Sequence, residues 1–407
     1  MRIAHIVRRF VFEEWGGTES VVWNTVREQL ASGDRPEIFC TSALRKAGEG
    51  DWEKDSVRIH YLGYRYPYFP MNARDRHELD LKGGSPLVPS LEKAVKAFKP
   101  DIVHIHCGGR LAAAAVKLAA KLGVPSVISL HGGDASVPKQ ELDKMMRPMR
   151  GKFPWGGIVD RLKGLRFEPL SRADAILSLS RAECEKLHRT HPKSDVRYFP
   201  NGVSVPGGVG TSCAAPERGG FKGRIVSVAR IDYQKNQKLL LDVLAAEKDA
   251  TLRLVGPVTS SWYRDEILKR AKELGVEDRL TIVPPLEYGS AELEREFAGA
   301  DVFALASVHE PFGIVALEAW THRLPLMCAH TGGLVDLVRD GENGVSFDAA
   351  DGASAVAAYR RLAADAALRE RLVERAAEDV KAFAWPNLIA RLHGIYEELI
   401  QRKAVER

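Results

Sequence analysis

The densest group of potentially reactive side chains is the stretch HEPFGIVALE, residues 309–318. It follows a short apolar run typical of a buried strand and precedes a pattern typical of a helix. Gly313 lets the backbone approach a ligand closely, and the free amides at the helix start, those of Gly313 and Ile314 among them, favour an anion such as phosphate. Glu318, two turns into the helix, could accept hydrogen bonds from a diol. Glu310, ahead of the helix, would point at whatever lies beyond the phosphate.

Two cations flank a predicted turn in the segment VSVARIDYQKN, residues 226–236. A strand is expected to end at Ala229, which would place Arg230 and Lys235 at its carboxyl end. Two cations there, in the same half of the chain as the phosphate-binding helix, suit a diphosphate. Taken alone, a solvated charged turn explains the segment equally well.

Two glycine-rich turns follow expected strands in the first half of the chain. Gly16 and Gly17 precede a helical pattern and permit close approach of an anion, although the GxGxxG pattern of nicotinamide-binding domains is absent. The alternative is an ordinary tight turn. His131 ends another strand within LHGGD, residues 130–134, where it could polarise or hydrogen-bond a ligand. A purely structural histidine is the alternative there.

A framework of alternating strands and helices must position these turns. Short β-branched runs alternate with longer amphipathic stretches, which is typical of βα units around a parallel sheet. The expected strands are 3–7, 36–40, 57–61, 102–106, 126–130, 175–179, 196–199, 224–229, 251–255, 280–283, 302–305, 326–328 and 344–347. The expected helices are 19–31, 90–98, 111–122, 236–246, 263–274, 290–298, 313–321, 333–339, a helical tail over 353–382, and 386–403.

The series is interrupted by residues 204–223, which are rich in Gly, Pro, Ser and Ala and lack the large apolar groups of a core. We therefore expect a first doubly wound domain over 1–203, a linker over 204–223, and a second doubly wound domain over 224–382. A C-terminal helix over 383–407 should pack back toward the first domain. Two such domains place a ligand in a cleft outside the carboxyl ends of their strands.

The composition agrees with this organisation and excludes other classes. The chain of 407 residues is too long for one core, and its 45% hydrophobic and 28% charged residues are typical of a globular protein. No stretch reaches the ~18 uninterrupted apolar residues of a membrane-spanning helix. Arg8 and Arg9 interrupt the first apolar run, so we expect no export signal and a cytoplasmic location. The five cysteines form no CxxC pair and predict free thiols in a reducing compartment.

The net charge of +5 is unevenly distributed. Residues 1–200 carry 33 positive and 24 negative side chains, whereas residues 201–407 carry 26 and 30. The basic half suggests an anionic partner, but no nucleic-acid-binding motif is present. Positive charge is densest in residues 144–166, where seven Lys or Arg and the single Asp160 are interleaved with large apolar residues. This segment suits the surface of an anionic membrane at its inner face, an anionic soluble acceptor, or simple packing on the first domain.

Several motifs together resemble the retaining nucleotide-sugar glycosyltransferases of family 4, whose GT-B architecture has two facing Rossmann-like domains. In the family's order they are PDIVHIH, SLHGGD, FPNGV, VSVARIDYQKN, the Glu310/Glu318 motif, TGGLVDLVRDGENG and FAW. The resemblance covers essentially the whole chain, and several motifs in one order are more specific than any one of them. One departure is Val335-Asp336, where the family commonly has Pro-Glu, which puts any role of Asp336 in doubt.

The resemblance implies roles for four groups expected to be catalytic. Glu310 would contact the hydroxyls of the donor sugar, and His131 would lie near that sugar. Arg230 and Lys235 would hold the diphosphate and stabilise its charge as a leaving group. Transfer would retain the anomeric configuration. We expect no metal, because no Asp-x-Asp motif lies in a suitable loop, and no cofactor beyond the nucleotide-sugar co-substrate.

The resemblance implies the donor-binding groups in the same way. Besides Arg230 and Lys235 they are Gly16, Gly17, Pro284, Leu286, Phe312, Gly313, Ile314, Val315 and Glu318. Glu318 would contact the ribose, and the segment from Pro284 to Leu286 would contact the base. The donor would be a UDP-sugar rather than a GDP-sugar. The acceptor would be a hydroxyl of a glycan, a lipid-linked compound or a small molecule, bound where residues 63–89 shape the first domain.

Two other functions fit the same architecture. A nucleotide-sugar-binding subunit without activity would need the same donor site, although the presence of Glu310, Arg230 and Lys235 argues against it. A sugar-nucleotide epimerase would share the fold and release no sugar to an acceptor.

Overall fold

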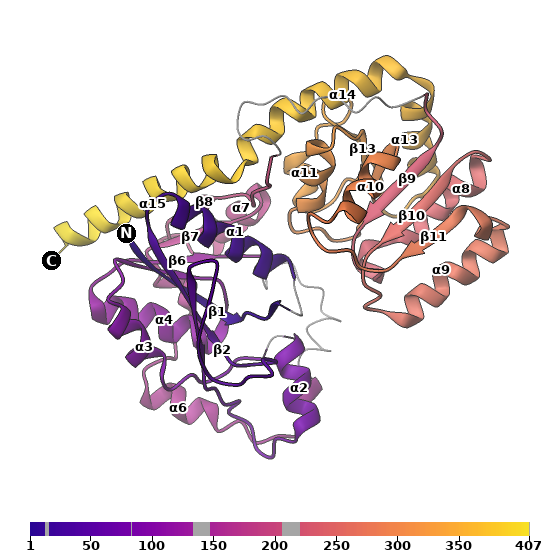
Figure 1. Cartoon of the computed structure of the whole chain (residues 1–407). Coiled ribbons are helices and arrows are strands. Elements are labelled where there is room, and N and C mark those ends of the chain that lie inside the picture. Colours follow the sequence, from indigo (N-terminus) through magenta and orange to yellow (C-terminus); the bar gives the residue numbers. More distant parts are fainter. Residues whose placement is uncertain (13–15, 83, 133–146, 206–219, 407) are drawn as a thin grey trace. The chain divides into compact units, whose positions relative to one another are not determined.

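The computed structural model describes residues 1–12, 16–82, 84–132, 147–205 and 220–406, and it divides into two compact units (Figure 1). Unit 1 comprises Met1–Pro200 and Leu388–Arg407, and unit 2 comprises Asn201–Asn387. Each unit is built around a largely or wholly parallel sheet with intervening helices, which confirms the expected α/β class.

Unit 1 contains an eight-stranded sheet in the order β3-β4-β2-β1-β5-β6-β7-β8, in which only β3 and β4 pair antiparallel. The strands are β1 (Arg2–Arg9), β2 (Arg35–Thr41), β3 (Gly50–Lys54), β4 (Val57–Leu62), β5 (Ile102–Ile105), β6 (Ser126–Ser129), β7 (Ala175–Ser178) and β8 (Val196–Tyr198). The helices are α1 (Gly17–Ala31), α2 (Ala73–Lys82), α3 (Leu91–Phe98), α4 (Gly109–Leu122), α6 (Gly156–Leu162) and α7 (Arg181–Thr190), with short 3-10 helices η2 (Arg147–Met149) and η3 (Pro169–Ser171).

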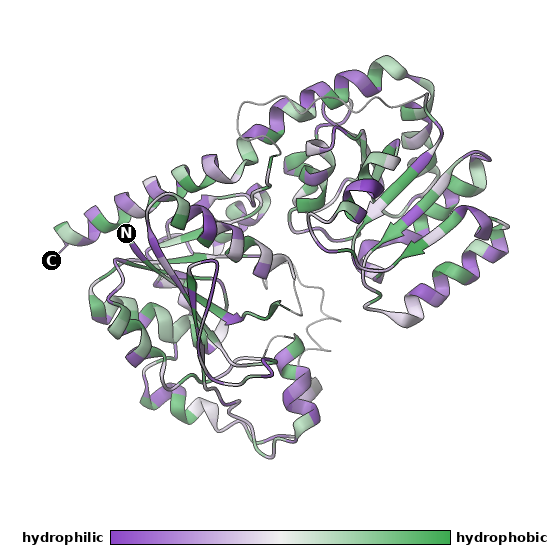
Figure 2. Ribbon diagram, in the orientation of Figure 1, coloured by the Kyte–Doolittle hydropathy of each residue, from purple (hydrophilic) through white to green (hydrophobic). Residues whose placement is uncertain are grey.

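Unit 2 contains a six-stranded, wholly parallel sheet in the order β11-β10-β9-β12-β13-β14. The strands are β9 (Arg224–Val228), β10 (Thr251–Val255), β11 (Leu280–Val283), β12 (Val302–Leu305), β13 (Leu326–Ala329) and β14 (Val345–Phe347). The helices are α8 (Leu241–Ala246), α9 (Ser261–Leu274), α10 (Ala291–Gly299), α11 (Ile314–Thr321), α12 (Leu334–Leu337), α13 (Gly352–Ala364) and α14 (Ala366–Asp379), with 3-10 helices η4 (Tyr233–Lys235), η5 (Gln237–Leu240), η6 (Glu277–Arg279) and η7 (Val380–Phe383). Figure 2 shows hydrophobic residues along the strands of both units, with hydrophilic residues among them.

Hydrophobic patterning does not predict strand β3, because all five of its residues are exposed. Asp55 and Ser56, with φ of 48° and 63°, turn the chain from β3 into β4. Positive φ at both central residues matches the twist of a two-stranded antiparallel ribbon. The turn and the backbone pairing with β4 therefore specify this strand.

Two segments that were each expected to form one continuous helix are interrupted in the structure. Asn236 adopts a left-handed φ of 50°, so the helix expected over 236–246 is instead η5 followed by α8. The helical tail expected over 353–382 breaks at Asp365. Its side chain accepts a hydrogen bond of 2.8 Å from the backbone N–H of Leu368 and caps α14.

The chain passes between the units after Pro200 and again after Asn387. Within unit 2, Val203 pairs with Ala384, and a Cβ on Gly202 would lie 2.4 Å from the indole of Trp385. Residues 201–203 therefore belong to unit 2, whereas the expected first domain extended to 203. Most of the predicted linker over 204–223 lies outside the described residues.

The last helix, α15 (Trp385–Val405), begins at Trp385 rather than at 383 and packs on unit 1 over most of its length. Its apolar face forms one core cluster with the sheet, made of Ile389, Leu392, Ile395, Tyr396 and Leu399 together with Ile3, Ile102, Val127, Ala175 and Leu177. None of the described helices, α15 included, is long and apolar enough to cross a membrane.

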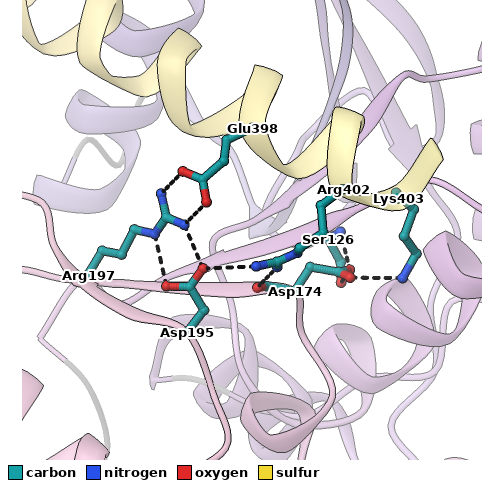
Figure 3. Close-up of polar contacts among 7 residues, drawn as sticks. All are labelled: Ser126, Asp174, Asp195, Arg197, Glu398, Arg402 and Lys403. Atoms are coloured by element: carbon teal, nitrogen blue, oxygen red, sulfur yellow. Dashed lines mark hydrogen bonds and ion pairs between the residues drawn. The ribbon is translucent and has the colours of Figure 1, made fainter. Parts of the chain in front are cut away.

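Charged groups attach the polar face of α15 to the strands beneath it (Figure 3). The Arg197 guanidinium, on β8, forms paired hydrogen bonds with Asp195 and with Glu398 at 2.6–2.9 Å. Asp174 accepts hydrogen bonds of 2.8 Å from the backbone of Ser126 and from Lys403 Nζ. The hydrogen bonds from Arg197 lower the pKa of Asp195 and of Glu398.

We expect Glu398→Gln to reduce the free energy of unfolding at pH 7 by up to about 1 kcal/mol, because the pair is half exposed and screened by solvent. The lowered pKa means that this contribution is present above the unfolded value of about 4.3 and is lost as the pH falls through the folded value. Urea unfolding at pH 7 and at pH 3 measures both effects. Glu397→Gln is the control. A wild-type advantage over Glu398→Gln that persists undiminished at pH 3 would contradict the role of the ion pair.

Candidate active site

Three loops at one edge of the unit 2 sheet bring together most of the predicted donor-side residues. They follow β9, β12 and β13, which are neighbours in a parallel sheet, so their carboxyl ends meet at the same edge. The Val308 N–H donates to the Gln234 carbonyl at 2.9 Å and joins the first two loops. The Thr331 hydroxyl donates to the Val308 carbonyl at 3.1 Å and joins the third.

Glu310 lies in this edge as one member of a buried ion pair. Lys235 Nζ is 2.6 Å from Glu310 Oε2, and the Ser307 hydroxyl donates to the same oxygen at 3.0 Å. The Glu310 residue is only 6% exposed, and a carboxylate buried to this degree needs a paired charge to offset its desolvation. No described residue donates to Oε1 of Glu310, which leaves that oxygen as an acceptor for a ligand.

Two glycines after β13 allow the third loop to pack directly against the backbone of Glu310 and Pro311. Gly332 has a φ of +54°, and a Cβ there would lie 2.1 Å from the Glu310 carbonyl oxygen. A Cβ on Gly333 would lie 2.3 Å from the Pro311 carbonyl oxygen, and the Gly333 N–H donates to the Glu310 carbonyl at 2.8 Å. This contact fixes the backbone from which the Glu310 carboxylate projects.

Helix α11 begins a few residues after Glu310, and its first backbone N–H groups have no hydrogen-bond acceptor among the described residues. Its N-cap is Gly313, whose φ of +97° is accessible to glycine and which offers no side chain to cap the helix. The backbone N–H groups of Gly313, Ile314 and Val315 have no acceptor among the residues that the structure describes. Such a helix start favours an anion.

Arg230 and Phe312, which were also predicted to bind the donor, lie in different environments. Arg230 is exposed at the end of β9, and its carbonyl accepts a hydrogen bond of 2.7 Å from the buried Gln237 side chain. Phe312 is 2% exposed, and its ring lies 6.1 Å from that of Phe383. Its side chain is thus a core group, so a donor contact at this position would have to come from the backbone.

Glu318 is placed in α11 with no ion pair among the described residues. Desolvation, with a smaller effect from Glu294, raises its pKa to about 7. Burial raises the pKa of Tyr288, which follows β11, and the negative charge of Glu318 adds to that rise. In that same segment Pro284 is exposed and Leu286 is half-buried, so a planar group could rest there. The sequence pattern did not indicate Tyr288.

In unit 1, Gly16 and Gly17 form the start of α1. Gly16 is the N-cap and forms no side-chain cap, and Gly17 is exposed with open space where a Cβ would be. The buried Glu19 beside them pairs with Arg9 at 3.5 Å. Trp15, immediately before these glycines, lies outside the described residues.

His131 follows β6 and ends a row of buried histidines. His131 Nε2 is 2.9 Å from His106 Nδ1, and His106 Nε2 is 3.0 Å from His5 Nδ1. Sequence reasoning missed His5 and His106, although HIH at the end of the expected strand 102–106 was a signal for the second. The last two residues of the LHGGD motif, Gly133 and Asp134, lie outside the described residues.

One group in the described part of the chain has the spacing of a metal site, namely His5, His104 and His106. Hydrogen bonds account for both ring nitrogens of each residue. His104 bonds Tyr396 and the Ser129 hydroxyl, and His5 also bonds Gln29 at 2.8 Å. No lone pair in this group is left for a cation.

Residues 63–89, expected to shape the acceptor site, fold around one buried carboxylate. Tyr64 and Tyr66 donate to Asp80 of α2 at 2.8–2.9 Å, and Arg8 donates to the Asp80 carbonyl at 2.8 Å. The aspartate of the basic segment, Asp160, accepts hydrogen bonds of 2.8–2.9 Å from Arg110. Residues 144–146 of that segment lie outside the described residues.

Two α/β units, with a phosphate-directed helix start and a fixed carboxylate at one sheet edge, fit a glycosyltransferase of the GT-B type, and the comparisons with known proteins show this class. The model for Glycosyltransferase Family 4 matches residues 15–205, and the model for Glycosyl transferases group 1 matches residues 217–379. The chain belongs to the family 4 type of these enzymes.

Individual relatives are glycosyltransferases by name, and solved structures share the fold. A D-inositol 3-phosphate glycosyltransferase of Stackebrandtia nassauensis is 28% identical over 96% of this chain and 88% of its own length. A sulfoquinovosyl transferase of Arabidopsis thaliana is 27% identical over 74% of this chain and 57% of its own length. The fold matches sucrose-phosphate synthase of Thermosynechococcus elongatus (TM-score 0.72, 19% identity, 98% of this chain and 99% of that one). It also matches Anabaena HepE in complex with UDP and glucose (TM-score 0.70, 17% identity, 98% and 100%).

The raised pKa of Glu318 predicts a distinctive dependence of stability on pH. Its folded pKa of about 7 exceeds the unfolded value of about 4.3, so ionisation opposes folding and stability falls as the pH rises between these values. We expect Glu318→Gln to be more stable than wild type at pH 8 by about 1–3 kcal/mol, and the two to converge near pH 4. Thermal unfolding across this range measures the difference. Glu277→Gln, at an exposed glutamate of the same unit, is the control, and identical pH profiles for Glu318→Gln and wild type would contradict the assignment.

Proposed function

We propose that the protein transfers a sugar from a UDP-sugar to an acceptor hydroxyl, with retention of the anomeric configuration and without a metal ion. The observation that best supports this is the Lys235–Glu310 pair beside the uncapped start of α11. The pair presents a fixed carboxylate oxygen to sugar hydroxyls, and the adjoining amides suit the phosphates of the same donor molecule.

The charge inventory of this edge suits departure of a nucleoside diphosphate. When the bond between the anomeric carbon and the phosphate oxygen breaks, negative charge grows on the diphosphate. Arg230, the Lys235 ammonium group and the first amides of α11 can stabilise that charge without a metal ion. Retention requires the acceptor oxygen to end on the ring face from which the diphosphate departs.

Two observations guide the choice of substrates. A solved structure with this fold holds UDP and glucose, which supports a UDP-sugar as donor. The name of the relative that covers 96% of the chain supports D-inositol 3-phosphate as the first acceptor to test, and the excess of cations in residues 1–200 suits an anionic acceptor.

We expect Glu310→Gln and Arg230→Ala each to lower kcat/KM by about 100-fold or more, because each removes a group that stabilises the transition state. Release of UDP from UDP-hexoses, with and without acceptors, measures the rate. EDTA should leave it unchanged, and the coupling constant of the anomeric proton in the product should report retention. Arg264→Ala, at a partly exposed arginine on α9 of the same unit, is the control.

The possible outcomes separate the alternatives. UDP release that no acceptor stimulates would contradict transfer, and interconversion of UDP-sugars would indicate an epimerase. Donor binding without turnover under all conditions would indicate a binding subunit. Loss of activity in EDTA that is restored by a divalent cation would contradict metal independence.

We also propose that unit 1 contacts an anionic membrane through an exposed apolar cap made of Phe69, Phe153, Ile158 and Leu162. These side chains are 59–82% exposed, and backbone hydrogen bonds of 2.8 and 3.1 Å hold Phe69 and Phe153 side by side. Ile158 and Leu162, one turn apart, share a face of α6.

The exposed charges of residues 150–166, which carry three of these four side chains, are mainly positive. Arg150, Arg161, Lys163 and Arg166 are exposed, whereas the acid of this segment, Asp160, is bound to Arg110. Each cation near an anionic bilayer contributes about 1 kcal/mol, which together with the apolar side chains supports loose adsorption.

We expect the chain to sediment with phosphatidylglycerol-containing vesicles at low salt, less so at high salt, and not with neutral vesicles. The double variant Ile158→Ser/Leu162→Ser should lower the bound fraction severalfold by removing half of the cap. Trp262→Ser/Leu268→Ser, which changes two exposed apolar residues of unit 2, should bind like wild type. Binding that is unaffected by the first variant, or absent in wild type, would rule out this surface.

A further inference from the structure

A continuous row of hydrogen bonds links His131 to the interior of unit 1. From the inside outward it runs from Gln29 on α1 to His5 on β1, then to His106 after β5, and finally to His131 after β6. The successive distances are 2.8, 3.0 and 2.9 Å. All three histidines and Gln29 belong to one unit, so the row is formed independently of the other half of the chain.

Each ring in this row is uncharged at neutral pH. Burial lowers the pKa of His5 and of His131 to about 4, and that of His106 well below its usual range. A neutral imidazole has one N–H donor and one lone-pair acceptor, so the proton position on one ring dictates that on the next. The row therefore has one of two directions, and the amide of Gln29 selects between them.

Contacts at the inner end favour one direction. Gln29 Oε1 faces His5 Nε2, while Gln29 Nε2 faces the Tyr396 hydroxyl of α15 at 3.5 Å. His5 Nε2 then donates to Gln29, His106 Nε2 donates to His5, and His131 Nε2 donates to His106.

The outer end is an unused acceptor. With Nε2 of His131 protonated, its Nδ1 holds a lone pair, and this buried nitrogen has no hydrogen-bond partner among the described residues. A buried polar atom without a partner is unfavourable, and a hydrogen bond from a bound hydroxyl would remove that cost. His131 stands just beyond the carboxyl end of β6, at the sheet edge where α/β folds bind ligands.

We propose that Gln29, His5 and His106 are positioning residues that fix the tautomer of His131, so that its Nδ1 accepts a hydrogen bond from a hydroxyl of the bound sugar. The part that concerns the sugar rests on the proposed function. The tautomer itself is a property of the free protein.

The first test reads the protons directly. Two-bond ¹H–¹⁵N correlation spectra of the full chain labelled at histidine distinguish protonated from unprotonated ring nitrogens, and the signals lost in His131→Asn assign that residue. We expect Nε2 of His131 to be protonated and Nδ1 not. A protonated Nδ1, or a mixture of both tautomers in wild type, would overturn the proposal whatever the enzymatic activity.

The second test breaks the row and compares neighbouring imidazoles. His106→Phe removes the acceptor for His131 Nε2, and we expect it to mix the tautomers and to lower kcat/KM for the UDP-sugar about tenfold, as changes behind a functional histidine commonly do. His106→Gln keeps a donor and an acceptor and should restore most of both. His104→Phe is the matched control, because His104 is equally buried on β5 but bonds Tyr396 and Ser129 outside the row.

A further pair covers the case in which His106→Phe fails to fold. Gln29→Met keeps the volume but removes the inner acceptor, whereas Gln29→Glu keeps it. We expect the His131 spectrum to change in the first variant and to persist in the second. Equal losses in His104→Phe and His106→Phe, or an unchanged His131 spectrum in both His106→Phe and Gln29→Met, would show that these residues only pack the core. If no donor is turned over by wild type while the tautomer is as expected, the proposed function fails and the row stands.

Discussion

The candidate site of unit 2 depends on the burial of one ion pair, Lys235–Glu310. A carboxylate that is 6% exposed is stable only where a cation and further donors surround it, and here Lys235 and Ser307 meet that requirement. The pair requires that the β9 and β12 loops adjoin, which their parallel pairing provides. It also requires that the third loop lie against the Glu310 backbone, which only glycines at 332 and 333 permit. The same contacts define where α11 begins and where its amides are presented.

In unit 1, buried histidines are accommodated as neutral groups rather than as members of an ion pair. The sheet of this unit buries several ionisable rings, whose pKa values are lowered by burial, so they remain neutral and bond to one another. In a row of neutral rings, the position of the N–H on one ring determines its position on the next, and no net charge is present. Carboxylate charge in unit 1 is stabilised locally, by tyrosine hydroxyls at Asp80 of α2 and by the Arg110 guanidinium at Asp160. The surface that remains around α6 is consequently basic and partly apolar.

The last helix connects these features, since it carries part of the core of a unit that begins almost 400 residues earlier. Tyr396 lies within that core and touches both Gln29 and His104, so the packing of α15 and the hydrogen bonding of the histidines are coupled. The ion pairs of Arg197 and Asp174 add register to this packing. A change in α15 can therefore reach the interior of the sheet without touching a ligand.

The local sequence pattern was sufficient to predict most of the fold, because buried strands and amphipathic helices have characteristic spacings of hydrophobic residues. It was also sufficient to predict the glycine at the start of α11. It failed where structure depends on a partner: β3 has no apolar pattern of its own, and Asp365 breaks a helix by capping the next one. Sequence singled out Glu310, Lys235 and His131 but could not pair the first two, 75 positions apart. Nor could it join Gln29, His5, His106 and His131, or show that Phe312 faces the core. Only the tertiary structure decides these contacts, because hydrogen bonds and ion pairs depend on atoms within about 3 Å of each other in space, wherever they lie along the chain.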